Sequence, residues 1–281
     1  MPITLRVAAA TALVSALLLG LFPGLDQEVS RLFFDASIRR FPVAATEWGR
    51  ALRACGMYLP HAVWIAATVS LLLALVRPAR PMPMRPSAAV FLIVIALVVP
   101  ALIVNAGFKQ NWGRPRPVHV AEFGGTQAFK PWWDSSGPCR GSCSFMSGET
   151  SAATMLVGAA TLAASTVRPL AIGAAALFTL LIGVMRVAFG GHWLSDVLLG
   201  GSGSVLLMLG LRRLLLDARG IRDEEARRAL AQAGLALRAW TDGARRAIWL
   251  GLADVTAAIR LAAGRLSGLR RPGWRMPAAA E

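Results

Sequence analysis

The sequence AAVFLIVIALVVPALIVNA, residues 88–106, contains no charged side chain. A helix that crosses the hydrocarbon core of a bilayer needs about 20 predominantly apolar residues, so this stretch predicts a transmembrane helix. Five further apolar stretches approach the same length: residues 7–22, 59–76, 150–167, 169–185 and 197–211. The sequence therefore predicts an all-α membrane protein with six transmembrane helices.

The composition of the whole chain agrees with this class. Of its 281 residues, 56% are hydrophobic and 16% are charged, whereas about a quarter of the residues in a soluble domain are charged. A disordered chain is excluded as well, because so apolar a sequence has ample surface to bury. The net charge of +15 could suit nucleic acid, but apolar runs of this density favour anionic lipid. We therefore expect a membrane as the partner and no nucleic acid.

Basic residues in the short connections predict the orientation of the helices. Arg77, Arg80 and Arg85 follow the second apolar stretch, and Arg168 follows the fourth. Because basic residues near the ends of spans favour the cytoplasmic side, we expect both termini to be cytoplasmic. Three connections would then lie outside: residues 23–58, 108–149 and 186–196. The first stretch lacks the small-residue cleavage site of a signal peptide, so we expect it to remain as a helix.

This organisation predicts three regions along the chain. Residues 1–56 hold the first helix and an outer loop, residues 57–214 form a membrane core, and residues 215–281 form a basic cytoplasmic tail. The tail mixes arginines and acids with apolar residues at helical spacing, among them Trp240, Ile248, Trp249 and Leu252. One interpretation is an amphipathic helix on the inner leaflet. A partly ordered, solvated tail fits the composition equally well.

Residues suited to phosphate binding gather in the second outer connection. Lys109 and Arg116 follow the third apolar stretch and are seven residues apart, so they share a helix face for as long as that helix persists. Ser147 and Gly148 open the fourth stretch, where a serine suits an N-cap and a glycine lets an anion approach free backbone N–H groups. Taken singly, each group is also explained by interfacial snorkelling or by simple helix capping.

A third group joins the fifth and sixth apolar stretches. Arg186 ends the fifth, and His192 precedes Asp196 by four residues, which places both on one face if this turn is helical. A carboxylate that orients an imidazole and stabilises its charge is what a nucleophilic or acid–base histidine needs. Arginine and lysine both bind phosphate. Together the three groups predict a phosphate site with a nucleophile on the outer side of the membrane.

Two cysteines lie in the second outer connection. Cys139 and Cys143 are four residues apart, and Cys55 is the third cysteine of the chain. In an oxidising periplasm the two could pair and pin the segment next to Ser147. Two free thiols are the alternative, and a metal site is not expected because no histidine lies close by.

These motifs resemble those of the type 2 phosphatidic acid phosphatases, membrane lipid phosphatases that share a fold with the vanadium haloperoxidases. The first motif of that family, K-x6-R-P, matches Lys109, Arg116 and Pro117. The third, S-R-x5-H-x3-D, matches Arg186, His192 and Asp196, with Met185 in place of the serine. The second, P-S-G-H, is altered to Met146-Ser147-Gly148-Glu149. The resemblance covers residues 57–211.

The resemblance implies a metal-independent phosphatase that uses no cofactor and works through a phosphohistidine. His192 would attack phosphorus while Asp196 holds its tautomer. The residues implied to bind the phosphate are Lys109, Arg116, Ser147, Gly148 and Arg186. Glu149 stands where a histidine of the family protonates the leaving alcohol. Either Glu149 is the acid, or it only shapes the site, or the leaving group needs little help.

On this basis we expect a lipid phosphatase of the bacterial inner membrane with its site facing the periplasm. The S-G-E variant and the C-x-x-x-C pair are similar to those of some lipid A phosphatases, which favours the glycosidic 1-phosphate of lipid A as substrate. Undecaprenyl pyrophosphate and phosphatidylglycerol phosphate are the alternative substrates. A lipid phosphotransferase would use the same residues, whereas a non-catalytic binder of lipid phosphate would not need the nucleophile.

Overall fold

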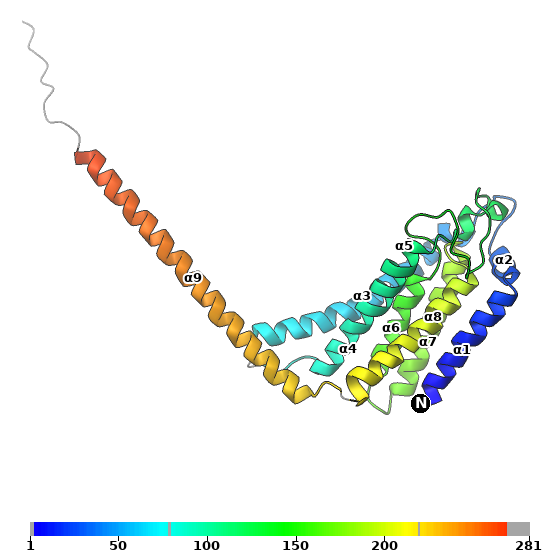
Figure 1. The fold of residues 1–281 in the computed structure, drawn as a ribbon, viewed down its shortest axis with the longest axis horizontal. Helices are drawn as coiled ribbons and strands as arrows, with labels where there is room; N and C mark the ends of the chain where they lie inside the picture. The colour runs from blue at the N-terminus through cyan, green and yellow to red at the C-terminus, as the bar shows by residue number, and fades with distance from the viewer. Residues whose placement is uncertain (1–2, 78–79, 219, 269–281) are drawn as a thin grey trace, which may run out of the picture.

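The computed structural model describes residues 3–77, 80–218 and 220–268, and within these ranges the chain is helical without a β-strand (Figure 1). The α-helices are α1 (Ile3–Leu21), α2 (Gly24–Arg31), α3 (Glu47–Val76), α4 (Pro86–Ala96), α5 (Lys109–Asn111), α6 (Gly148–Ala160), α7 (Arg168–Ala188), α8 (Leu194–Arg212) and α9 (Asp223–Gly268). Two π-helical segments, η2 (Leu97–Phe108) and η5 (Arg213–Ala218), continue α4 and α8. Three short 3-10 turns are η1 (Pro42–Ala45), η3 (Pro117–His119) and η4 (Ala121–Phe123).

Four of these helices are long and apolar enough to cross a bilayer: Glu47–Val76, Pro86–Asn111, Arg168–Ala188 and Leu194–Asp217. The pair α1–α2, bent by 91°, brings the number of candidate spans in the described ranges to at most five. The sixth predicted span, residues 150–167, is not among the candidates, because α6 has only 13 residues, a length of about 20 Å. The structure thus confirms an all-helical membrane protein with four or five candidate spans by length and composition, and the count of six stays a prediction.

Pro100 does not break the helix that contains it. A proline lacks the N–H of an ordinary residue and usually kinks an α-helix. Here the helix runs without interruption from Pro86 to Asn111 and becomes π-helical over its second half, Leu97–Phe108. The wider π-turn bonds each N–H to a carbonyl five residues back, a known local adjustment around such a residue. The unbroken helix carries Lys109 to the end of the bundle where the long loops gather (Figure 1).

Glycines allow the central helices to approach one another closely. A Cβ atom at Gly158 of α6 would lie 2.8 Å from Cδ1 of Ile95, and one at Gly183 of α7 would lie 2.5 Å from Cγ1 of Val197. Both distances are shorter than a van der Waals contact, so these positions accept no side chain without movement of a neighbour. This packing fixes α6 and α7 against α4 and α8.

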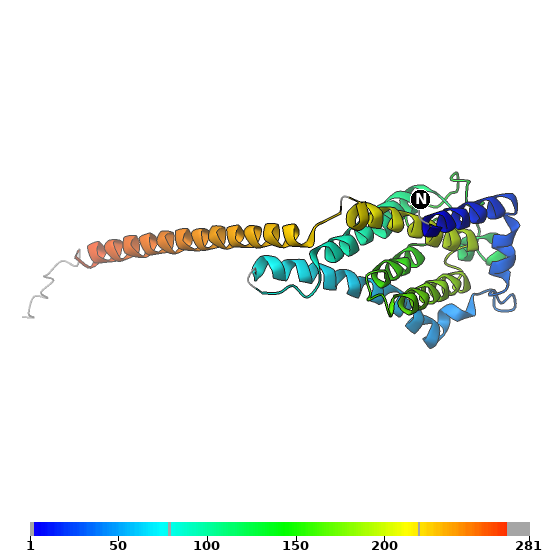
Figure 2. The same ribbon diagram turned by 90° about the horizontal axis from the view of Figure 1, so that it is seen from below.

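The chain turns sharply between α1 and α2. α2 leaves α1 at 91° after Pro23 and contacts the start of α8, where the backbone N–H of Ser195 donates to Oδ1 of Asp26 at 2.8 Å. α9 leaves the bundle at the opposite end and extends away from it (Figures 1 and 2). The protein therefore has an end formed by loops and α2, called here the outer end, and an end where α9 begins, called here the inner end.

The close contact at Gly183 predicts that a single methyl group destabilises the bundle. Gly183→Ala places a Cβ against the rigid side chain of Val197, and overpacking of this kind costs about 1–3 kcal/mol. We expect a lower melting temperature in detergent. Gly173→Ala in the same helix is the control, because a Cβ there meets no atom within 4 Å. Equal melting temperatures for the two variants would contradict this prediction.

Candidate active site

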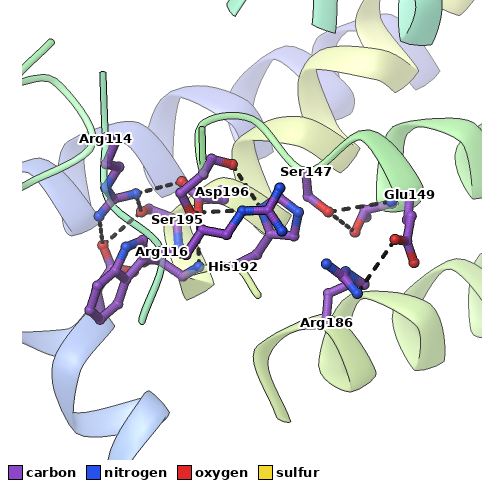
Figure 3. A network of polar contacts seen from close by, with 12 residues as sticks. Arg114, Arg116, Ser147, Glu149, Arg186, His192, Ser195 and Asp196 are labelled. Carbon is purple, nitrogen blue, oxygen red and sulfur yellow. Dashed lines mark hydrogen bonds and ion pairs between the residues drawn. The ribbon is translucent and has the colours of Figure 1, made fainter. Parts of the chain in front are cut away.

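The three sequence groups come together at the outer end of the bundle. Figure 3 shows residues from the loop after α5, from the start of α6, from the end of α7 and from α8 around one space. A Cβ at Gly148 would lie 3.2 Å from Nζ of Lys109, which places that ammonium group beside the first turn of α6. All eight residues expected to form the site lie at this end: Lys109, Arg116, Ser147, Gly148, Glu149, Arg186, His192 and Asp196.

His192 is buried, with 1% of its surface exposed, and one of its nitrogens has no partner. Its Nδ1 lies 2.8 Å from the backbone carbonyl oxygen of Ser144, and because a carbonyl only accepts, Nδ1 carries the proton. Burial lowers the pKa of His192 to about 3, so the ring is neutral at physiological pH. Nε2, for which the described residues offer no hydrogen bond, therefore holds a free lone pair.

The contact between His192 and Asp196 differs from the expected one. Oδ2 of Asp196 lies 3.6 Å from Nδ1 of His192, beyond hydrogen-bond distance. It accepts hydrogen bonds instead from Oγ of Ser144 and, at 2.8 Å, from the backbone N–H of Trp193. The backbone carbonyl of Ser144 is the group that contacts the imidazole. Asp196 thus orients His192 through Ser144, and the i, i+4 spacing alone does not produce the direct bond.

Behind Asp196 lies a buried ion cluster that the sequence motifs do not predict. Arg114, with no exposed surface, donates to Oδ1 of Asp196 at 2.6 Å and to Oδ2 of Asp26 at 2.7 Å. Oγ of Ser195 lies 2.7 Å from Nη1 of Arg114 and donates to Asp26 at 2.6 Å. The only sequence signals are a second Arg-Pro pair, Arg114-Pro115, and an acid soon after the first apolar stretch.

Glu149 is held by two arginines. Its Oε1 accepts from Nη2 of Arg53 at 3.2 Å and lies 3.4 Å from Nη1 of Arg186, and its Oε2 is buried with no partner in the described ranges. The two ion pairs direct this carboxylate toward the arginines, so the arrangement supports a role in shaping the site over a role as proton donor. Arg53 belongs to α3, which begins at Glu47, twelve residues before the apolar stretch that predicts it.

The start of α6 has the geometry that an anion site needs. Ser147 is fully buried and caps the helix, because its Oγ accepts from the N–H of Thr150 at 3.4 Å. A Cβ at Gly148 would lie 2.6 Å from Oδ1 of Asn105, so a larger residue would displace that neighbour. The first N–H groups of a helix have no acceptor within it. Next to the ammonium group of Lys109, they make a place for phosphate.

A short disulfide loop supports Arg116. The structure joins Cys139 to Cys143, whose Cα atoms lie 5.7 Å apart. Within this loop, the backbone carbonyl of Ser142 accepts from Nη2 of Arg116 at 2.8 Å. The disulfide loop thus contacts the guanidinium group of Arg116, and the expected restraint on the segment that leads to Ser147 stays a prediction. In the described ranges no three His, Cys, Asp or Glu side chains gather closely enough to hold a metal ion.

A groove of about 390 Å³ leads from this site along the bundle, between α3, the helix Pro86–Asn111 and α6. Charged groups line its outer end, where Arg53, Lys109 and Glu149 meet. Its remaining walls are mostly apolar and include Met57, Pro60, Trp64, Leu97, Pro100 and Met155. The arrangement suits a molecule with an anionic head and an apolar body.

Comparison with known proteins identifies the family. The sequence model of the PAP2 superfamily matches residues 87–219. A lipid A 4'-phosphatase of Francisella tularensis subsp. novicida is 33% identical to the chain over 183 residues, which are 64% of this chain and 82% of that relative. The chain belongs to the PAP2 superfamily.

Two Rhizobium proteins are also similar to this PAP2 protein. The lipid A 4'-phosphatases of Rhizobium leguminosarum and Rhizobium etli are 36% and 37% identical over 118 residues, which are 42% of this chain. The chain spans about half the length of these two relatives, 51% and 46%. No solved structure matches this PAP2 protein.

The buried cluster predicts that Arg114 is essential for stability. Arg114→Met leaves the carboxylates of Asp26 and Asp196 without their shared cation. An uncompensated buried charge costs about 3–5 kcal/mol, so the variant should melt far below the wild type in detergent. Arg31→Met is the matched control, because Arg31 pairs with acids at the surface, where ion pairs contribute little. Similar small losses in both variants would speak against a stabilising role of the cluster.

Proposed function

We propose that this PAP2 protein is a lipid phosphatase that removes a phosphate group from lipid A through a phosphohistidine. The free Nε2 of His192 carries the proposal. It is a buried, neutral nucleophile next to the cations Lys109, Arg116 and Arg186. A binder of lipid phosphate would need those cations but not an activated imidazole.

In the first step, the lone pair of His192 Nε2 attacks phosphorus and the bond from phosphorus to the lipid oxygen breaks. Nδ1 keeps its proton and donates a hydrogen bond to the Ser144 carbonyl oxygen. The phosphorylated ring therefore carries a positive charge. Asp196, held near the ring through Ser144, stabilises that charge. Because Glu149 is ion-paired, the leaving oxygen takes its proton from water, and the hydroxide that remains takes up the proton that the attacking water loses in the second step.

In the second step, water attacks the phosphohistidine, the nitrogen–phosphorus bond breaks, and inorganic phosphate leaves with a neutral imidazole behind. Through both steps the phosphoryl oxygens bind Lys109, Arg116 and Arg186 and the N–H groups at the start of α6. Such fixed donors stabilise the charge that develops on the phosphoryl group in the transition state of its transfer. None of these roles requires a metal ion or a cofactor.

The groove explains why the substrate would be a lipid. Its charged end coincides with the phosphate site, and its apolar walls follow α3 and α6 toward the middle of the bundle. Met57 and Leu97, which line it, are 37% and 50% exposed, so the groove opens along the side of the bundle. A lipid can therefore place an acyl chain in the groove while its phosphate reaches His192.

The names of the relatives favour the 4'-phosphate of lipid A over the 1-phosphate expected from the sequence. A 1-phosphate is glycosidic and leaves easily, which would suit a site without an acid. A 4'-phosphate is an ordinary ester, and its leaving oxygen needs more electrostatic help. Arg53, fixed by Glu149 at the mouth of the groove, supplies a cation for that oxygen.

We place the protein in the inner membrane of a bacterium, with both termini in the cytoplasm and the outer end facing the periplasm. Arg77, Arg80 and Arg85 lie at the inner end and favour the cytoplasmic side. In this arrangement α6 completes six crossings despite its length, because it returns the chain from the outer end to the start of α7 (Figure 1). Its neighbours shield its short ends from lipid.

Phosphate release from defined lipids tests the function. We expect the purified protein, in detergent with a metal chelator, to release phosphate from the 4' position of lipid A faster than from the 1 position, undecaprenyl pyrophosphate or phosphatidylglycerol phosphate. His192→Ala should abolish the release, because it removes the attacking nitrogen.

Arg31→Met, a change at the surface of the outer end, should keep full activity and serves as the control. Appreciable hydrolysis by His192→Ala would remove His192 as the nucleophile. Release from none of the three lipids would contradict the proposed function itself.

The ion pairs of Glu149 predict the behaviour of Glu149→Gln. The amide keeps the shape of the side chain but loses the charge that holds Arg53 and Arg186. We expect kcat/KM to fall at least about tenfold, or about 1.4 kcal/mol, by the same factor on an alkyl lipid phosphate and on an aryl phosphate that needs no acid.

Glu122→Gln, which alters a partly exposed carboxylate, is the matched control and should leave both rates unchanged. A much larger loss on the alkyl substrate than on the aryl one would show that Glu149 is the proton donor instead.

A further inference from the structure

α9 is a helix of 46 residues that no catalytic argument uses. At 1.5 Å per residue it is about 69 Å long. Its first turns lie against the ends of α3 and α4, and the rest extends past the bundle, crosswise to the direction of α1 and α8 (Figures 1 and 2). Its contacts with the spanning helices show where along the bundle axis it lies.

Three contacts fix the level of α9. Oδ1 of Asp223 accepts from the N–H of Ser87 at 2.9 Å, in the first turn of α4. Gly234 touches the backbone of Leu75, close to the end of α3. Arg238 donates to the carbonyl of the last residue of α3. Since one spanning helix ends and the next begins here, α9 lies at the membrane–water boundary of the inner end.

The distal half of α9 carries an apolar stripe on the helix face that Gly234 occupies in the proximal half. Ile248, Leu252, Val255 and Ile259 follow one another at intervals of four, three and four residues, and their exposed fractions are 63%, 52%, 55% and 62%. Leu252 comes eighteen residues after Gly234, or five full turns at 3.6 residues per turn. The stripe therefore continues the face that contacts α3.

Cations accompany this face. Arg245 lies between Gly234 and the stripe and follows Gly234 by eleven residues, about three turns. At the same level, the loop between α3 and α4 carries exposed Arg77, Arg80 and Arg85 and, by sequence, no acid. Arginines at the edge of an apolar surface suit the headgroups of anionic lipids.

We propose that α9 lies on the leaflet at the inner end and binds anionic phospholipid. The stripe enters the acyl boundary, and Arg245 with the arginines of the α3–α4 loop contacts the headgroups. The level of α9, its crosswise direction and its stripe favour a lipid surface over a second copy of the chain. The proposal rests on the bundle crossing a membrane and is independent of the reaction at the outer end.

Two neighbouring labels test it on the full chain. Leu252→Cys is on the stripe, and Asp254→Cys, two residues later, faces away from it by about 200°. Each is combined with Cys55→Ser, because Cys55 is the free, exposed cysteine, and carries a nitroxide. The protein is placed in wide lipid nanodiscs, and the accessibility of each nitroxide to oxygen and to a water-soluble nickel chelate is measured.

With phosphatidylglycerol in the disc, we expect the label at 252 to be reached by oxygen and protected from nickel, and the label at 254 to show the reverse. Pure phosphatidylcholine should reduce the protection at 252. Ile259→Cys serves as a second stripe position if the first variant is poorly made. Equal nickel accessibility at both positions would overturn the proposal, as would spin–spin broadening between two copies.

Discussion

Two buried carboxylates that share one guanidinium group hold the site together. Asp26 and Asp196 both bind Arg114, which is fully enclosed and stacked near Phe129 and Trp193. Charges removed from water are tolerated only where each finds partners, so this cluster permits little variation in the position of α2, the loop after α5, or α8. His192, the nucleophile in the proposed reaction, is held by the same cluster, because Asp196 fixes Ser144, whose carbonyl sets the tautomer of the ring.

On the substrate side, charges are arranged differently. Lys109 and Arg186 act on His192, and Glu149 contacts Arg186 and, at the mouth of the groove, Arg53. A dianionic phosphate would neutralise the positive charge that Glu149 leaves uncompensated. A protonated His192, in contrast, would be repelled by these cations. Burial, and after it the charges of Arg186 and Lys109, lower the pKa of His192 and keep its ring neutral.

The motifs locate those residues whose roles depend on local spacing, and the structure brings Lys109 and His192 to one end of the bundle as expected. Contacts between distant parts of the chain are beyond such reasoning. Asp26 meets Ser195 across 169 residues, and no periodicity signals it. Arg53 is not predicted as a site residue for another reason. Hydropathy indicates where α3 becomes apolar, whereas the helix already begins after its N-cap Thr46. The end of α6 is also not predicted, because the helix stops at Ala160 although its apolar stretch runs to residue 167.

The shared guanidinium also orders events during synthesis. Asp26 is synthesised 88 residues before Arg114 and 169 residues before Ser195. Its carboxylate therefore lacks both partners until the helices between them have been synthesised. The cluster closes only when α8 arrives. A nascent chain that has already exposed Lys109 and Arg116 therefore still lacks the contacts of Ser144 and Asp196 that orient His192, so the proposed site is completed late in synthesis.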